Sequence, residues 1–197
     1  MKIVFFILLT FLTTNELLWA RQNITGGRYE LLSGVRQNKD PKSYWDQKFD
    51  KSNYVYGKDP AKFLARNHNY IPANSSVLDV GMGEGRNAVF LARQGHRVTG
   101  IDISTVAVKK AQQLAKEFNV RIETVVSPVE KYKVEPNTFD SILCFYYLDR
   151  GITDKLIEWL KPGGILIFEN YTDYQKKIGG LEGYDSRQLL RPGELLT

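Results

Sequence analysis

The sequence has little from which to build a metal site, a disulfide or a cysteine-based catalyst. Cys144 is the only cysteine in 197 residues, so no disulfide can form within the chain. Its place in an apolar run predicts a buried thiol that behaves as a small hydrophobic side chain. His68 and His96 are the only histidines, and neither has a cysteine or carboxylate at ligand spacing. We therefore predict no metal site.

A dense basic stretch is also absent. The formal charge is +5, but the cations are scattered, and Lys109-Lys110 and Lys176-Lys177 occur only as pairs. A nucleic-acid groove requires a denser basic footprint than this. We expect a small-molecule partner and no nucleic acid.

No apolar run is long enough for an ordinary membrane span, and the longest lies at the N-terminus. Lys2 precedes the apolar run from Ile3 to Leu12, which is typical of a secretory signal. Removal after Ala20, retention as an anchor and a downstream translation start all remain open. We assign residues 1–20 to this signal-like or anchor segment and exclude them from the fold, and a membrane contact is expected only through them.

The rest of the chain reads as one domain preceded by an arm. Residues 21–40 carry glycine pairs and polar residues without periodicity, which predicts a linker or loosely ordered arm. The domain is expected to cover residues 41–197. Pro41 is suited to open a helix, Trp45 and Phe49 then share one face, and a short helix over 60–67 follows.

From Ser76 onward, apolar strands alternate with helical segments, the pattern of βαβ units. This predicts an α/β fold, a Rossmann-like open and mostly parallel sheet with helices on both faces. Only 29 residues follow Phe168, so we expect the sheet to lack its last two strands or the chain to be a fragment. The expected strands are 77–80, 97–102, 121–126, 139–146 and 165–168, and the expected helices are 86–94, 105–118 and 154–160.

A glycine-rich turn joins the first of these strands to the helix that follows. Gly81, Gly83 and Gly85 lack the Cβ atoms that would keep a ligand away from the backbone. The helix start at Arg86 offers unpaired N–H groups and a positive dipole end, which suit a carboxylate. A turn of this kind alone is weak support, because many nucleotide-binding sheets have one.

Two carboxylates make the ligand more specific. Asp79 lies two residues before Gly81, where it would repel a pyrophosphate and attract an ammonium or sulfonium group. Asp102 follows Gly81 by 21 residues, the spacing at which an acid reaches the hydroxyls of a bound ribose. Both charges fit one ligand, S-adenosylmethionine.

The segment Val77-Leu-Asp-Val-Gly-Met-Gly-Glu-Gly85, with Asp102, resembles the first motif and second-strand acid of the class I S-adenosylmethionine-dependent methyltransferases. The resemblance covers residues 41–170 and implies a seven-stranded sheet in the order 3-2-1-4-5-7-6. Within the class, Gly83–Ala88, Phe90–Ala92, Trp45 and Tyr56–Pro60 resemble the tellurite-resistance and thiol methyltransferase branch.

The resemblance also implies the site. Pro128 stands where the family often places an acid for the adenine, so Ser127, the backbone near Val129 or Glu130 must take that role. From their positions, Trp45, Tyr56, Tyr146 and Tyr147 are expected either to shape an acceptor pocket or only to cover the end of the sheet. The cofactor is expected to be bound by Asp79, Gly81, Met82, Gly83, Gly85, Arg86, Asp102, Ile103, Ser127, Val129 and Phe145.

These residues favour an enzyme that transfers a methyl group to a small-molecule acceptor, such as a thiol or a chalcogen oxyanion. In-line displacement from a sulfonium depends mainly on positioning, so we predict no dedicated catalytic side chain. The alternatives are a non-catalytic, degenerate cofactor-binding domain and, with less support, an NAD-dependent oxidoreductase. Cofactor supply favours a cytoplasmic location and the apolar leader favours export or anchoring, so the location stays open.

Overall fold

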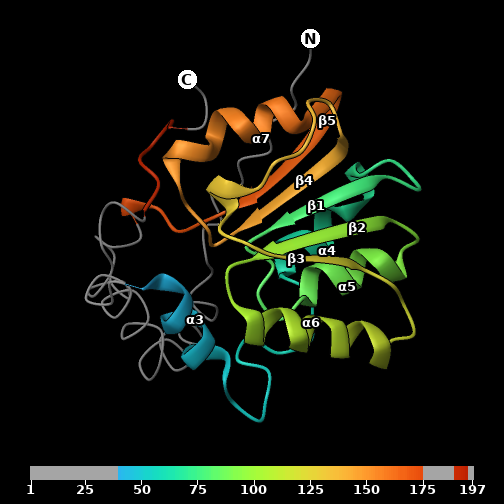
Figure 1. Cartoon of the computed structure of the whole chain (residues 1–197). Helices are drawn as coiled ribbons and strands as arrows, with labels where there is room; N and C mark the ends of the chain where they lie inside the picture. The colour runs from blue at the N-terminus through green and yellow to red at the C-terminus, as the bar shows by residue number, and fades with distance from the viewer. Residues whose placement is uncertain (1–39, 175–188, 195–197) are drawn as a thin grey trace.

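The computed structural model describes residues 40–174 and 189–194 (Figure 1). The signal-like segment and almost all of the predicted arm lie outside these residues. Within the described part, no helix is both long and apolar enough to cross a membrane. The helices are α3 (Pro41–Phe49), α4 (Lys62–Asn67), α5 (Arg86–Arg93), α6 (Thr105–Glu117) and α7 (Thr153–Trp159), with 3-10 turns at His68–Tyr70, Val129–Lys131 and Arg150–Ile152.

A five-stranded sheet forms the centre of the described molecule. Its strands lie in the order β3-β2-β1-β4-β5, and every neighbouring pair is parallel. The predicted Rossmann-like fold is therefore confirmed, and the order matches the first five strands of the implied one. The strands are β1 (Ser76–Val80), β2 (Arg97–Asp102), β3 (Glu123–Val126), β4 (Phe139–Phe145) and β5 (Leu160–Glu169).

Alternate residues of the central strands face two different helical layers. Leu78 and Ile142 belong to one apolar cluster, which includes Trp159 of α7. Val77 and Leu143, one residue away in each strand, belong to a second cluster with side chains of α4 and α5. Both faces of the sheet are covered at its centre, so β1 and β4 are almost entirely buried, as central parallel strands usually are.

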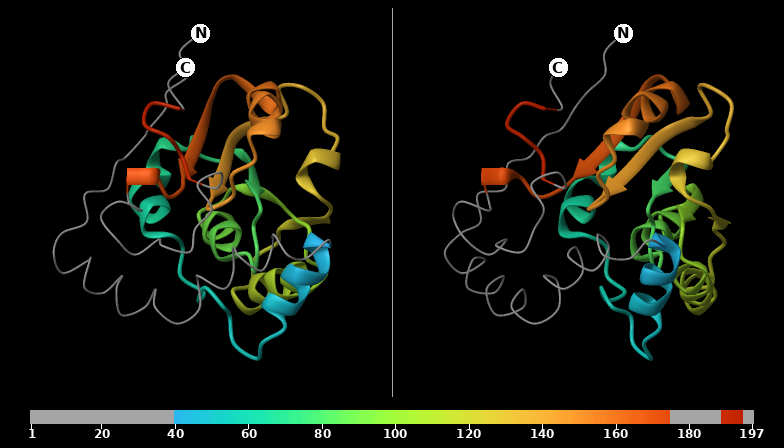
Figure 2. Two further views of the ribbon diagram at one scale, coloured as in Figure 1. Left: turned by 90° about the vertical axis from the view of Figure 1, so that its left-hand side faces the viewer. Right: turned by 60° about the vertical axis from the view of Figure 1, so that its left-hand side comes forward.

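Helix α3 lies at the carboxyl ends of the strands, beside α6 (Figures 1 and 2). Asp40 caps it by accepting a hydrogen bond from the Lys42 N–H at 3.0 Å, and Pro41 occupies the first turn as predicted. Asp46 then accepts hydrogen bonds from the Ser104 hydroxyl and the Val106 N–H at the start of α6. These bonds fix α3 across the end of the sheet.

Most predicted boundaries differ from the structure by two residues or fewer, and the start of β5 differs most. We expected residues 161–164 to separate α7 from a strand over 165–168, but β5 begins at Leu160. Leu160 already pairs with Phe139, and the register shifts before Ile165 pairs with Ser141. Gly163, with φ +79°, lies within this irregular stretch. Pairing with β4 therefore takes in a segment whose local sequence indicates only a turn.

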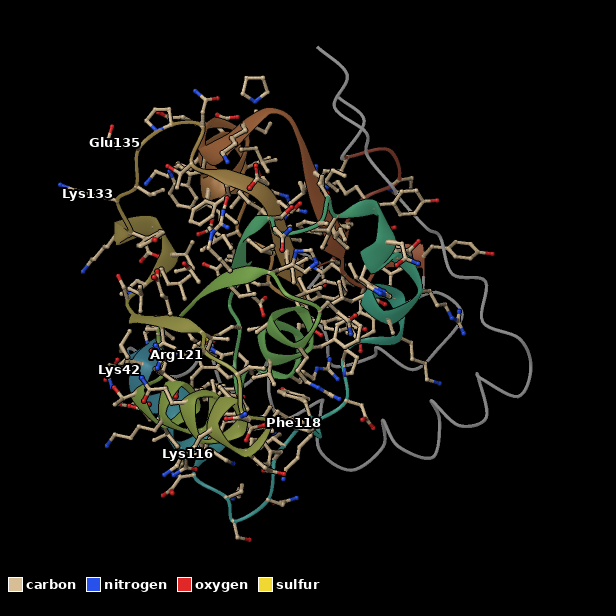
Figure 3. All side chains as sticks on the ribbon, turned by 90° about the vertical axis from the view of Figure 1, so that its right-hand side faces the viewer. Lys42, Lys116, Phe118, Arg121, Lys133 and Glu135 are labelled. Atoms are coloured by element: carbon tan, nitrogen blue, oxygen red, sulfur yellow. The ribbon has the colours of Figure 1, made fainter. Side chains whose placement is uncertain are left out.

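Basic side chains are spread over the surface. Figure 3 shows Lys42 on α3, Lys116 on α6 and Lys133 in the loop before β4, with the labelled side chains at the periphery of the molecule. This agrees with the scattered cations of the sequence.

Candidate functional site

A cavity of about 400 Å³ lies at the carboxyl ends of the strands. The turns after β1, β2 and β3, the ends of β4 and β5, and helix α3 all contribute to its wall. All four residues predicted for the acceptor pocket line it: Trp45, Tyr56, Tyr146 and Tyr147. So do nine of those predicted to bind the cofactor: Asp79, Gly81, Met82, Gly83, Arg86, Asp102, Ile103, Val129 and Phe145.

The glycine turn presents its backbone to this cavity. Gly81 and Gly83 have φ values of +66° and +55°, which favour glycine. A Cβ atom on Gly81 would lie 3.2 Å from the Tyr147 side chain. Both positions therefore need glycine for their backbone conformation, and Gly81 also needs it for space.

Gly85 has a different role from the one that we predicted. It does not line the cavity. Its φ is +83°, and a Cβ atom there would lie 2.6 Å from the Cβ of Ala111 on α6. Gly85 is therefore required for the close packing of α5 against α6, and the sequence motif alone does not distinguish this from ligand approach.

Asp79 is a buried carboxylate at the cavity. Its side chain is 2% exposed, and Oδ2 has no hydrogen-bond partner among the described residues. Burial is the largest influence on this carboxyl and, with the neighbouring Asp102, raises the pKa of Asp79 to about 7, while Arg86 and an N–H bond from Ala88 oppose the rise. A cation placed beside Asp79 would return the carboxyl to its ionised form.

Asp102, at the end of β2, is also buried. Its two oxygens accept hydrogen bonds from the N–H groups of Gly83 and Ser104, each at 2.8 Å. Burial raises the pKa of Asp102 above its ordinary value, against the effect of these bonds. Each carboxylate oxygen has a second lone pair, so the group can still accept bonds from ligand hydroxyls. Asp102 thus shapes the glycine turn and faces the cavity.

The turn after β3 provides the wall near Val129. Pro128 and Glu130 line the cavity together with Val129, but Ser127 does not. The Ser127 hydroxyl instead donates to the Pro128 carbonyl at 2.9 Å. Of the three candidates for binding the adenine, Val129 and Glu130 therefore line the cavity and Ser127 does not.

Aromatic rings form a further part of the cavity wall. Trp45 and Phe49 stack with centroids 5.6 Å apart, and Phe49 meets Tyr56 edge-on at 6.1 Å. Tyr146 has a positive φ of +56°, unusual for so large a residue, and its ring lies 5.2 Å from that of Tyr171. Tyr146 is 42% exposed as a whole, but local burial of its hydroxyl raises the pKa above the ordinary value of 10, and the hydroxyl is protonated at neutral pH.

Comparisons with known proteins agree with this geometry. Residues 77–164 match a family model described as a methyltransferase domain. The ubiquinone biosynthesis O-methyltransferase of Vibrio cholerae is 30% identical over 139 residues, which cover 61% of this chain and 57% of that protein. A methyltransferase structure from Thiobacillus denitrificans in complex with S-adenosylhomocysteine has a TM-score of 0.51 and 23% identity, covering 61% of this chain and 52% of that one.

Residues 77–164 are thus similar in sequence to a methyltransferase domain, and the described chain has the fold of such domains. The same fold occurs in the [4+2]-cyclase SpnF, with a TM-score of 0.54, 25% identity and coverage of 68% of this chain and 51% of that one. The chain spans 57% of the length of the Vibrio relative. That relative is named for O-methylation and gives no support to the tellurite-resistance and thiol branch.

The sequence did not identify every residue that lines this cavity. Asn170 and Tyr171, which follow β5, line the cavity, as do Pro41 and Phe49 of α3. Asn170 and Tyr171 could have been predicted, because they follow a strand and the carboxyl ends of neighbouring parallel strands meet at one edge of a sheet. For Phe49, the sequence predicted only that it shares a helix face with Trp45.

Proposed function

We propose that this methyltransferase domain binds S-adenosylmethionine in the cavity and transfers its methyl group to a small-molecule acceptor. The main support is Asp79, a buried carboxylate that faces the cavity with one oxygen unpartnered within the described residues. The ammonium group of the cofactor would supply the missing partner. Asp102 would bind the ribose hydroxyls, and Val129 and Glu130 would border the adenine.

The bound sulfonium supplies an electrophilic methyl group, whose bond to sulfur breaks as its bond to the acceptor forms, and S-adenosylhomocysteine is left. The protein contributes position and exclusion of water. Trp45, Phe49 and Tyr56 cover the cavity, and Tyr146 and Tyr147 provide hydroxyl groups that are donors rather than bases at neutral pH. The acceptor proton passes to solvent, or the acceptor arrives ionised.

Two acceptor classes have support. The name of the Vibrio relative favours a hydroxyl oxygen, and the aromatic rings around the cavity favour a planar, apolar acceptor. The resemblance of Gly83–Ala88 to the tellurite-resistance and thiol branch instead favours a thiol or a chalcogen oxyanion. We favour the hydroxyl class, because it rests on similarity over 139 residues.

The test is transfer of a labelled methyl group from S-adenosylmethionine to a panel of catechols, other phenols, small thiols and selenite, with the product mass measured. Labelled product from the phenolic compounds alone would support the hydroxyl class. Product from thiols or selenite alone would support the other branch.

A non-catalytic domain remains the alternative, since a shared fold also accommodates other chemistry. Cofactor binding without transfer to any member of the panel would favour it. Binding of NAD in preference to S-adenosylmethionine would contradict the whole proposal.

A further inference from the structure

A buried ion pair joins the glycine turn to α6. Nζ of Lys110 lies 2.5 Å from Oε1 of Glu84, and the two side chains are only 12% and 2% exposed. Glu84 lies between Gly83 and Gly85 of the turn and lines the cavity. Both side chains of the pair also form hydrogen bonds that the sequence motif does not indicate.

Both members of the pair bind the backbone of residues 49–57, which we call the roof segment. Oε2 of Glu84 accepts hydrogen bonds from the N–H groups of Val55 at 2.7 Å and Tyr56 at 3.4 Å.

The Lys110 ammonium donates hydrogen bonds to carbonyl groups of the same segment. It donates to the carbonyls of Phe49 at 3.2 Å, Lys51 at 3.1 Å and Asn53 at 2.7 Å. One carboxylate and one ammonium group thus bind five backbone groups of a segment that forms no regular helix or strand after Phe49.

The roof segment carries two of the aromatic rings that cover the cavity, Phe49 and Tyr56. Phe49 also rests on the glycine turn, because a Cβ atom on Gly83 would lie 3.5 Å from its ring. The position of these rings therefore depends on the same turn that is expected to bind the cofactor.

We propose that Glu84 and Lys110 are positioning residues that hold the roof segment closed over the cofactor pocket. This inference rests on the proposed cofactor. A bound cofactor would lie beneath Phe49 and Tyr56, and loss of the pair would open the pocket to water.

A positioning role can be separated from a contribution to stability. Removing one member of a buried ion pair leaves an uncompensated charge, whereas replacing both with apolar side chains of similar size is often neutral. The double variant Glu84→Met/Lys110→Met should therefore restore stability but lack every bond to the roof segment.

The experiment compares Glu84→Met, Lys110→Met and the double variant with Glu117→Met in the full chain. Glu117 forms an ion pair with Lys58 at 2.7 Å, but both side chains are at least 40% exposed. The measurements are the thermal midpoint, hydrogen exchange of the amides in residues 49–57, and the affinity for S-adenosylhomocysteine by calorimetry.

We expect both single variants to melt well below the wild type and the double variant to recover most of that loss. In Glu84→Met and the double variant, the amides of Val55 and Tyr56 should exchange faster. In all three variants the affinity should fall by about tenfold or more, the effect of losing a hydrogen bond to a charged group. Glu117→Met should match the wild type in every measurement.

The proposal is overturned if the double variant keeps wild-type exchange in residues 49–57, or if exchange rises while the affinity stays unchanged. A wild-type protein that fails to bind S-adenosylhomocysteine would instead refute the proposed function. In that case the exchange rates alone would still show whether the pair holds the roof segment.

Discussion

Replacing Asp79 with asparagine is expected to stabilise the ligand-free protein at neutral and alkaline pH. The carboxyl is buried, and its pKa is raised from the ordinary 3.8 to about 7. Well below pH 3.8, Asp79 is protonated in both the folded and the unfolded protein. As the pH rises toward 7, the unfolded chain releases its proton first, so stability is lost over this interval.

The size of the effect follows from the shift. Each unit of pKa difference corresponds to about 1.4 kcal/mol, so the ionised Asp79 lowers the free energy of unfolding by up to about 4 kcal/mol above pH 7. Asparagine has nearly the same shape and no charge to bury. For a chain of this size, the gain corresponds to an increase in Tm of about 10 °C.

The assay is thermal unfolding of wild type and Asp79→Asn without ligand, from pH 4 to pH 8. The two proteins should melt at similar temperatures near pH 4, and the variant should melt increasingly higher as the pH rises. A variant that is less stable at pH 8 would refute the reasoning, because it would mean that the Asp79 carboxylate is stabilised by its surroundings.

Three further predictions concern other positions. Gly85→Ala should lower the free energy of unfolding by about 2–4 kcal/mol in chemical denaturation, because its Cβ would collide with Ala111. Gly57→Ala, also at positive φ but with open space around it, should lower it by only about 1 kcal/mol, and equal losses would contradict the packing argument. Asp102→Ala should weaken S-adenosylhomocysteine binding by more than about tenfold in calorimetry, and unchanged affinity would remove Asp102 from the site. Burial opposes the ionised form of Asp140, but Lys161 and Ser76 lower its pKa to about 2. The ionised carboxyl should therefore stabilise the fold by about 1 kcal/mol above pH 4, and this should disappear toward pH 2. An Asp140→Asn variant that is destabilised equally at both pH values would contradict this.

Much of the fold could be predicted because the local signals agree with the tertiary structure. The strand over 97–102 was predicted with its observed bounds, and Ser104 caps α6 by accepting a bond from the Ala107 N–H. The start of β5 could not be predicted in this way, because pairing with Phe139 decides it and lies outside the local sequence.

The candidate site also combines features that the local sequence predicts with features that depend on distant contacts. The motif placed Asp79 and Asp102 at one edge of the sheet, where both line the cavity. It did not separate Gly85, which serves helix packing, from Gly81 and Gly83. It also could not reveal that Glu84 binds the roof segment, because the partners of Glu84 lie about 30 residues earlier in the chain.

The most direct test of the cofactor assignment is calorimetric titration of the full chain with S-adenosylhomocysteine at pH 7.5 and pH 5.5. If the ligand ammonium pairs with Asp79, binding should be micromolar at pH 7.5 and weaker by more than about tenfold at pH 5.5, where the carboxyl is protonated. Asp79→Asn should bind weakly at both pH values. No binding by folded wild-type protein, or binding by Asp79→Asn that equals the wild type at pH 7.5, would contradict the account.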